Sequence, residues 1–471
     1  MKTRGLLLLL TLSLPGLAAA QAARVGDLRY PPLPPFEIAR PERVVLDNGL
    51  VVMLLEDHEL PLVEATALVR GGTRLDPPGR AGLADLAATV LRAGGTGQMT
   101  GDALDLWLEN RAAAIEATAQ EDLVRITLSS LAQDFPDALR VYADVLRRPA
   151  FDGARLEVAR TQAISEVTRQ NDEPDDILFR EFRKALYGAD SPYAAVPTLA
   201  GLRALGREDL VAWHGRTFQP QQIVLGLAGD FRRDEALRLL REAFGDWPRG
   251  AQAAAPEIPY RTAPNPGVFW VRKDDIAQSN LMIGHLGIRS DDPDYYAVEV
   301  LNQVLSGSFA SRLINEVRTR KGLAYSVDGR VLDDWDHPGI AYLYASTKTA
   351  TTGAGLQALL DEARGLHTRP PTAEEVEKAK QGLLGSFIFN VDSKREVLGE
   401  LLTFELFGYP LDRLAQYRAG IEAVTLDQVR AAAVRHLRPE EFSLVVVGPA
   451  EGRDRPLTDF GKVTELDVTI E

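Results

Sequence analysis

The feature that most limits the possible folds of this chain is an internal repeat. The segment Gln219–Gly229 (QPQQIVLGLAG) aligns without a gap with Arg438–Gly448 (RPEEFSLVVVG), 219 positions later. In both copies a helical stretch leads to a proline, a polar pair, an apolar run of strand length and a glycine, and a helix cannot continue through that proline. Because the spacing is close to half of the 471 residues, we predict a tandem duplication rather than a chance similarity of two helix–strand junctions.

The repeat predicts two homologous domains, at residues 41–247 and 265–460. Between them, residues 248–264 contain four prolines and several alanines and show no hydrophobic periodicity. Such a composition is typical of an extended linker.

Each half combines strands with helices. In the first half, Asp47-Asn48-Gly49 between two apolar runs predicts a hairpin over 43–55, followed by a strand over 62–69 and a helix that begins at Leu83 and ends at Gly94-Gly95.

In the second half, helical spacing of apolar residues predicts a helix over 297–305 that stops before Gly307. The alternation of Ile340, Tyr342 and Tyr344 predicts a strand. We therefore expect an α+β fold of two tandem domains, each a largely antiparallel sheet packed with helices.

The first twenty residues have the pattern of a signal peptide. Lys2 and Arg4 precede an apolar run through Leu17, and Ala18-Ala19-Ala20 supplies a cleavage site. The run is shorter than the roughly 20 residues of a membrane anchor, and no later segment reaches that length. We expect a secreted protein without a membrane span, most simply in a bacterial periplasm.

Charge and cysteine content exclude several kinds of site. The formal net charge is −14, which argues against general binding to nucleic acid or anionic membranes, because both need clustered Lys and Arg. Cysteine is absent, so disulfides, thiolate catalysis, lipid acylation and Cys-based metal sites are excluded.

The histidines do not form a recognisable metal motif. No two of the six lie within five residues, so a helical His pair for zinc is missing, and we expect each to be a surface or hydrogen-bonded core residue. P-loop, G-x-S-x-G and G-x-G-x-x-G motifs are also missing. The histidines are His58, His214, His285, His337, His367 and His436.

Many short segments, in order and spacing, resemble the pitrilysin/insulinase family of zinc peptidases, in particular its half-size subunits related to mitochondrial processing peptidase. The resemblance spans nearly the whole chain after the signal peptide. Its segments are Val44–Leu50, Gly71–Arg74, Gly82-Leu83-Ala84, Asp172-Glu173-Pro174, Tyr187, Ser191-Pro192-Tyr193, Gly307–Leu313, Glu316-Val317-Arg318 and Lys321–Ser326.

The resemblance implies that the family's zinc motif is degenerate in this chain. Relatives carry an inverted H-x-x-E-H directly after the Gly-Leu-Ala stretch. Here Asp85 and Thr89 replace the two His ligands, Ala88 replaces the water-activating Glu, and Glu166 at the third-ligand spacing is retained. Alanine cannot accept a proton and Thr is a poor zinc ligand, so we expect no zinc at this motif. Asp85 and Glu166 are either a weak site for a hard cation or a hydrogen-bonded remnant.

The second-half signature is intact. Arg318 and Tyr325 resemble the family's Arg/Tyr pair, which in relatives closes over a zinc site on another domain. A guanidinium and a phenol can donate hydrogen bonds to a peptide carbonyl and to the oxyanion formed on attack. The alternatives are a surface charge paired with Glu316 or Glu400, and a half-buried strand aromatic.

Ser306-Gly307-Ser308 resembles the family's glycine-rich loop. The resemblance implies substrate binding at Gly307 and Ser308, where glycine lets a backbone approach closely. The alternative is a plain turn after a helix.

Two functions fit these residues. In the first, the chain is the non-zinc-binding subunit of a heterodimeric metalloendopeptidase. A homologous partner would supply H-x-x-E-H and the zinc, an extended peptide would add to a sheet edge, and this chain alone would hold no cofactor. In the second, it is an inactive peptide-binding holdase or a structural subunit.

Overall fold

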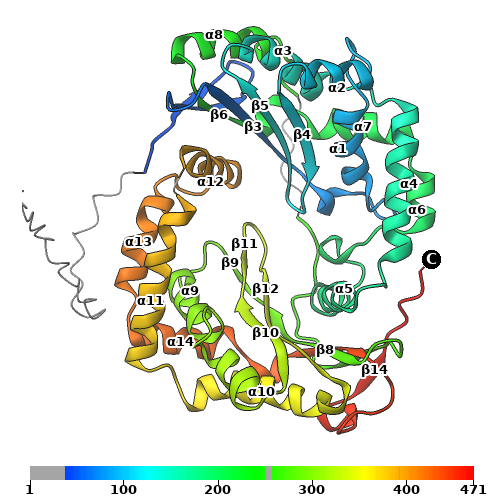
Figure 1. Cartoon of the computed structure of the whole chain (residues 1–471), viewed down its shortest axis with the longest axis vertical. Coiled ribbons are helices and arrows are strands. Elements are labelled where there is room, and N and C mark those ends of the chain that lie inside the picture. Colours follow the sequence, from blue (N-terminus) through cyan, green and yellow to red (C-terminus); the bar gives the residue numbers. More distant parts are fainter. Residues whose placement is uncertain (1–37, 251–256, 392, 471) are drawn as a thin grey trace, which may run out of the picture. The chain divides into compact units, whose positions relative to one another are not determined.

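Two six-stranded sheets organise the chain (Figure 1). The structure is a computed structural model that describes residues 38–250, 257–391 and 393–470. The expected signal peptide, residues 1–20, lies outside the described residues, as do residues 251–256 of the expected linker. Helices and strands from Ile38 onward form one compact unit.

The first sheet has the strand order β1-β2-β6-β3-β5-β4, and only the β2–β6 pair is parallel. Its strands are β1 (Glu42–Val45), β2 (Val51–Glu56), β3 (Leu62–Arg70), β4 (Ala114–Ala119), β5 (Leu123–Leu131) and β6 (Ile223–Gly229).

The second sheet has the order β10-β12-β8-β13-β7-β14, with β7 parallel to both of its neighbours. Its strands are β7 (Gly267–Arg272), β8 (Gln278–Leu286), β10 (Ala324–Val331), β12 (Ile340–Lys348), β13 (Ser443–Gly448) and β14 (Val463–Glu465). A short parallel pair, β9 (Ile288–Arg289) and β11 (Asp333–Asp334), forms a separate two-stranded sheet.

The internal repeat corresponds to a repeat of topology. Its two apolar runs become β6 and β13, each preceded by a short 3₁₀ turn at the proline. Each of these strands lies between one parallel and one antiparallel neighbour, at the same place in its sheet. The expected fold of two tandem, largely antiparallel α+β units is confirmed. The boundaries at 247 and 265 stay a prediction.

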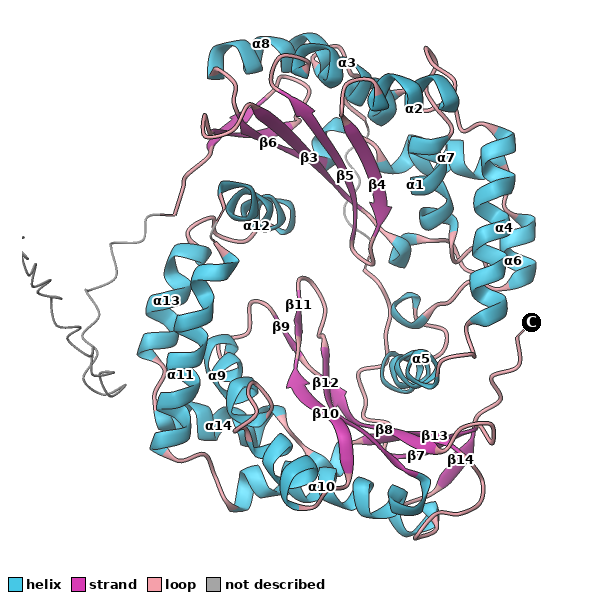
Figure 2. Ribbon diagram, in the orientation of Figure 1, coloured by secondary structure: helices cyan, strands magenta, loops and turns pink. Residues whose placement is uncertain are grey.

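Helices surround the two sheets (Figure 2). Those of the first half are α1 (Leu83–Ala93), α2 (Gly101–Glu109), α3 (Phe135–Arg147), α4 (Gly153–Arg169), α5 (Pro174–Tyr187), α6 (Leu199–Ala204), α7 (Arg207–Thr217) and α8 (Arg233–Phe244). Those of the second half are α9 (Tyr295–Leu305), the π-helix η5 (Ile314–Arg320), α10 (Thr352–Thr368), α11 (Ala373–Phe387), α12 (Lys394–Phe407), α13 (Arg413–Ala423) and α14 (Leu426–His436). None of the helices among the described residues is long and apolar enough to span a bilayer.

Each half covers one face of the other half's sheet with a single helix. Helix α12 of the second half packs on β2, β3 and β6 of the first sheet, and α5 of the first half packs on β8 and β13 of the second. The two helices are both fourteen residues long and begin 220 positions apart, at Pro174 and Lys394. Each half therefore contributes one helix to the sheet of the other half, and these exchanged helices occupy corresponding positions in the repeat.

Polar contacts at the rims hold the exchanged helices in place. Glu405 of α12 accepts two hydrogen bonds from Arg43, at 2.7 and 2.9 Å. Asp175 of α5 accepts hydrogen bonds from Asn280 at 2.5 Å and from the Tyr344 hydroxyl at 3.0 Å. At Gly226 of β6 an added Cβ would lie 2.6 Å from a terminal methyl of Leu402, so glycine lets α12 pack closely here without a shift of that side chain.

The exchange explains the burial of β12. The alternation of Ile340, Tyr342 and Tyr344 correctly predicted a strand, but these side chains are buried, and so are the intervening Ala341 and Leu343. One set packs against α5 and its neighbours, and the other set packs in the core of the second half. Both faces of the strand are covered.

Candidate functional site

The degenerate zinc motif lies on α1. The carboxylate of Asp76 positions this helix by accepting hydrogen bonds from the backbone N–H groups of Gly82 (2.9 Å) and Ala84 (3.0 Å). Asp85 and Thr89 are exposed on one face, and the Thr89 hydroxyl donates to the Asp85 carbonyl at 2.9 Å. Ala88 is buried in the core, so no group that could activate water stands at this position.

The structure brings Glu166 to the same place. It lies on α4, which packs against α1. Partial desolvation and then the charge of Glu166 raise the pKa of Asp85, although the Asp85 side chain remains exposed. A cavity of about 410 Å³ adjoins Glu166 and is also lined by Arg180, Arg183 and Tyr193. The site holds two neighbouring carboxylates and no imidazole, a poor set for zinc.

Arg318 and Tyr325 lie together on the second half. The guanidinium carbon of Arg318 is 5.1 Å from the centroid of the Tyr325 ring. Arg318 lies on η5, where the buried Leu313 and Val317 hold the segment against the core. Both alternative interpretations of this pair are wrong. Glu316 forms its ion pair with Arg320. Burial raises the pKa of Glu400, and the nearby charge that lowers it most is that of Arg125, not Arg318. Tyr325 is 82% exposed and therefore not half-buried.

Both residues stand at irregularities of the backbone. Tyr325 is the extra residue of a β-bulge in β10, because Ala324 pairs with Thr347 and Ser326 with the adjacent Ser346. A bulge turns its side chain away from the regular alternation of the strand. Arg318 lies in a π-helix, which also re-aims side chains and is frequent at functional sites.

A third side chain, Phe309, joins this pair and was missed in the sequence. Its ring centroid is 5.7 Å from the Arg318 guanidinium carbon, and the side chain is 79% exposed. In the sequence, its position directly after Gly307 and Ser308 was the one feature that could have indicated its role. Among the described residues, Arg318 has no hydrogen-bond or ion-pair partner, so its donors face the outside.

Gly307 and Ser308 form the exposed turn after α9. The Ser308 carbonyl accepts hydrogen bonds from the N–H of Ser311 (2.9 Å) and from its hydroxyl (2.5 Å). A Cβ at Gly307 would lie 2.7 Å from the Cα of Gln303, so a side chain here would crowd the last turn of α9. The turn carries Phe309 to the Arg318–Tyr325 pair.

The two groups are separate within the chain. In the part of the chain that the structure describes, no hydrogen bond, ion pair or ring contact joins Asp85, Ala88, Thr89 or Glu166 to Arg318 or Tyr325. The degenerate motif and the Arg318–Tyr325 pair are therefore two distinct groups of this chain.

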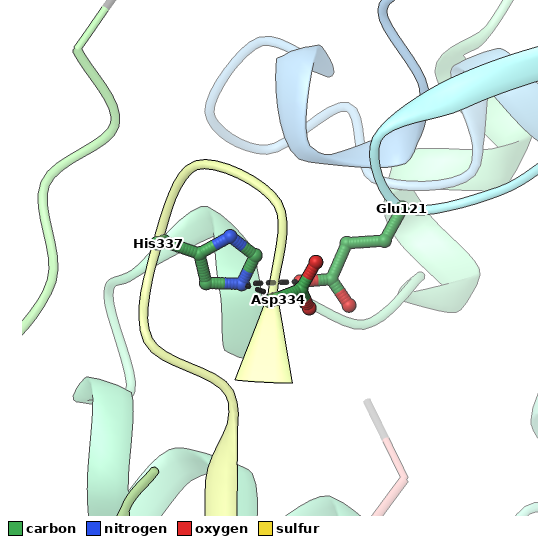
Figure 3. A group of neighbouring side chains, drawn as sticks. All are labelled: Glu121, Asp334 and His337. Atoms are coloured by element: carbon green, nitrogen blue, oxygen red, sulfur yellow. Dashed lines mark ion pairs between the residues drawn. The ribbon is translucent and has the colours of Figure 1, made fainter. Parts of the chain in front are cut away.

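A charged cluster that sequence reasoning passed over lies where the halves meet. His337, expected to be a surface or hydrogen-bonded core residue, is buried beside Glu121 and Asp334 (Figure 3). Asp122 and Asp336 also lie beside its ring. Burial disfavours the imidazolium, but the carboxylates of Asp336 and Glu121 outweigh that cost and raise the pKa of His337 to about 9. Burial and then the charge of Asp334 raise the pKa of Asp122. No sequence signal linked Glu121 and Asp122 to the other three residues, because more than 200 positions separate the two groups.

Comparison with known families matches both halves. The model described as "Insulinase (Peptidase family M16)" matches residues 51–194, and "Peptidase M16 inactive domain" matches residues 204–383. The non-peptidase homolog YmxG of Helicobacter pylori is 25% identical over 84% of this chain and 91% of its own length. An uncharacterised zinc protease of Mycobacterium leprae is 29% identical over 68% of this chain and 72% of its own.

Solved structures agree with the fold. A peptidase M16 inactive domain from Pseudomonas fluorescens superposes with a TM-score of 0.81 at 26% identity, over 88% of this chain and 99% of its own. The periplasmic protease PqqL of Escherichia coli gives 0.74 at 14% identity, with 88% of this chain matching 46% of PqqL. The matched models, the shared fold and the degenerate motif at Asp85, Ala88 and Thr89 lead to one conclusion. This chain belongs to peptidase family M16, as a homologue of the half-size, inactive kind.

Proposed function

We propose that this chain is the subunit without the catalytic zinc in a heterodimeric metalloendopeptidase of the periplasm. The partner is a homologous chain that carries H-x-x-E-H and the zinc, and Arg318 and Tyr325 bind the scissile carbonyl in trans. One observation carries the proposal: the Arg318 guanidinium, which has no hydrogen-bond or ion-pair partner among the described residues, lies over two exposed aromatic rings, those of Phe309 and Tyr325.

Edge strand β10 supplies a binding surface for an extended peptide. Among the described residues β10 is an edge strand that pairs with β12, and the exposed Tyr325 lies at its bulge. An added strand would place its carbonyls beside the Tyr325 hydroxyl and the Arg318 donors. Donors of this kind stabilise the developing oxyanion, and removing one costs roughly 10²–10³-fold in rate. The partner supplies the zinc-bound water and its base.

The test is turnover of the assembled complex. The chain is co-expressed with a secreted H-x-x-E-H relative from the same organism, and peptide cleavage is measured per mole of purified heterodimer. Tyr325→Phe and Arg318→Ala should each lower kcat/KM by roughly 10–10³-fold without changing assembly or the partner's zinc content. The chain alone should cleave nothing in a chelator-sensitive way.

Arg320→Ala is the matched control. Arg320 lies on the same π-helix, is exposed and pairs with Glu316, so its loss should leave turnover unchanged. Because Tyr325 is 82% exposed, Tyr325→Phe should not change stability, which separates a catalytic from a packing effect. Unaltered turnover in both test variants would contradict the proposal and leave a peptide-binding or structural subunit, the reading that the non-peptidase name of the Helicobacter relative favours.

A further inference from the structure

Two equivalent hairpins, one from each half, meet at their tips. The turn between β4 and β5 carries Glu121 and Asp122, and the longer connection from β10 to β12 carries Asp334, Asp336 and His337. Ligand-type atoms of Glu121, Asp334 and His337 all lie within 4.8 Å of one another (Figure 3). These side chains come from separate sheets, so whatever holds them together also holds the halves together.

The His337 imidazole points a buried nitrogen, without a hydrogen-bond partner, into this group. Its side chain is 1% exposed, and Nε2 is 3.5 Å from Glu121 Oε1 and 3.4 Å from Asp334 Oδ2. Glu121 Oε1 is also buried without a hydrogen-bond partner among the described residues. Both separations exceed the N–H···O range. They equal the roughly 3.4 Å between two ligands of a tetrahedral metal with bonds of about 2.1 Å.

The other atoms of these side chains are already occupied by groups that orient them. His337 Nδ1 lies 3.3 Å from Asp336 Oδ1, and Arg74 donates two hydrogen bonds to Asp336, at 2.5 and 2.8 Å. Arg183 donates to Glu121 Oε2 at 2.6 Å. A carboxylate on the far nitrogen of a ligating histidine is the common supporting contact of metal sites.

Two further contacts complete this support. The backbone N–H of Trp335 donates to Asp334 Oδ1 at 2.8 Å, which leaves Oδ2 for the group. The His337 ring stacks on Tyr193 at 3.8 Å between centroids. Each candidate ligand therefore has one atom held by another group, and the ligand-type atoms of the three side chains lie within 4.8 Å of one another.

The charged side chains around this group carry more negative than positive charge. Glu121, Asp122, Asp334 and Asp336 carry four carboxylates, against the guanidiniums of Arg74 and Arg183. Partly buried charges are costly without compensation, and without a metal a protonated His337 offsets only one of the two excess negative charges. A divalent ion that takes the place of the His337 proton offsets both.

We propose that Glu121 Oε1, Asp334 Oδ2 and His337 Nε2 bind a divalent transition-metal cation of the Zn²⁺ or Mn²⁺ kind, which clamps the two hairpin tips. An imidazole with two carboxylates suits these ions, whereas Mg²⁺ and Ca²⁺ prefer oxygen ligands alone. The site shares no residue with the degenerate motif on α1 and does not depend on the proposed peptidase role.

The experiment measures metal binding to the full chain after chelator treatment. ZnCl₂, MnCl₂, MgCl₂ and CaCl₂ are titrated separately by calorimetry, and metal content and Tm are recorded. We expect one equivalent of Zn²⁺ or Mn²⁺ and a rise in Tm that follows the ion concentration. His337→Gln and Asp334→Asn should each weaken binding by at least about 100-fold, and Asp336→Asn, which removes only a supporting contact, by roughly 10–100-fold.

His436→Gln is the matched control. His436 also lies beside two aspartates, but its Nε2 already has a hydrogen-bond partner in Asp294 at 2.7 Å, so the variant should bind metal like the wild type. Far-UV circular dichroism checks the fold of each variant without metal. Absence of stoichiometric metal in the wild type, or its retention in folded His337→Gln, would overturn the proposal. Loss of the metal in Glu166→Gln would place the ion at α1 and α4 and equally overturn it.

Discussion

Asp85 and Thr89 show how little has to change for a metal site to be lost. The two residues keep the helical face on which relatives place their ligands, and Glu166 still lies beside Asp85. What differs is the donor chemistry: one carboxylate and one hydroxyl stand where two imidazoles would bind zinc. The two helices that carry these residues, α1 and α4, pack against each other.

Restoring the two imidazoles should therefore restore zinc binding. In Asp85→His/Thr89→His, the new side chains and Glu166 form a three-ligand set on α1 and α4, so zinc content should rise by one equivalent above that of the unmodified chain. Mass spectrometry measures the metal content of the variant and of the unmodified chain. An ion bound elsewhere is present in both and does not contribute to the difference.

Adding Glu166→Gln to the double variant should remove the extra zinc. Adding Ala88→Glu should lower stability, because Ala88 is buried and a carboxylate there lacks compensation. A folded double variant with no extra zinc would show that α1 and α4 do not present these positions to one point.

At the scale of elements, an ion pair fixes the segment that leads to η5. Arg312 donates two hydrogen bonds to Glu375, at 2.6 and 2.7 Å, and others to the carbonyls of Arg369 and Pro370. Glu375 also completes the capping box at the start of α11, where it accepts from the N–H of Thr372 at 2.8 Å. The turn with Phe309 and the helix with Arg318 are thus tied to α11.

Glu375→Gln should reduce stability in a pH-dependent way. The hydrogen bond from Arg312, opposed in part by burial, lowers the pKa of Glu375 from 4.5 to about 2. Its contribution is complete above the unfolded value and is lost as the pH falls through the folded one. Urea unfolding should show a loss of about 1 kcal/mol at pH 7, allowing for solvent screening, and a shrinking difference from wild type below about pH 4.

Glu374→Gln is the control for this measurement. Glu374 precedes Glu375 on α11 and pairs with Lys378, but both side chains are exposed, so stability should stay near wild type at every pH. A constant difference between Glu375→Gln and wild type down to pH 3 would contradict the role of the ionised carboxylate.

Helices, strands and their order could be predicted from the sequence, because hydrophobic period and turn residues are local signals. The hairpin over 43–55 and the helices at 83 and 297 follow from such signals. The bulge at Tyr325 and the π-helix at Arg318 could not be predicted, since one extra residue in a strand or helix leaves no mark in composition. His337 was passed over for a related reason: its carboxylate neighbours Glu121 and Asp122 belong to the other half.

At the scale of the whole molecule, the exchanged helices make each half depend on the other. Without α12, the first sheet would expose Met53, Leu55, Leu68 and Val224. Without α5, the second sheet would expose Met282, Tyr344 and Val445. The sequence predicted two halves but not this dependence, because the apolar face of a helix does not indicate which sheet it covers.

Residues 38–247 and 265–470 expressed separately should therefore aggregate or bind a hydrophobic dye, whereas co-expression should recover a stable complex. Dye fluorescence and gel filtration of the single and co-expressed fragments measure this. The intact chain should unfold in one transition when followed by circular dichroism and by tryptophan fluorescence. If both fragments are soluble on their own and do not bind the dye, the prediction is contradicted.

The reciprocal positions of α5 and α12 also bear on how such a chain could arise. An ancestor made of one repeat would have left a sheet face bare, and pairing with an identical copy, each lending its helix to the other, would have covered both faces. Fusion of the two genes would remove the need for identical copies. One copy could then keep or lose ligands on α1, while the other could change the loop and bulge around Arg318 and Tyr325.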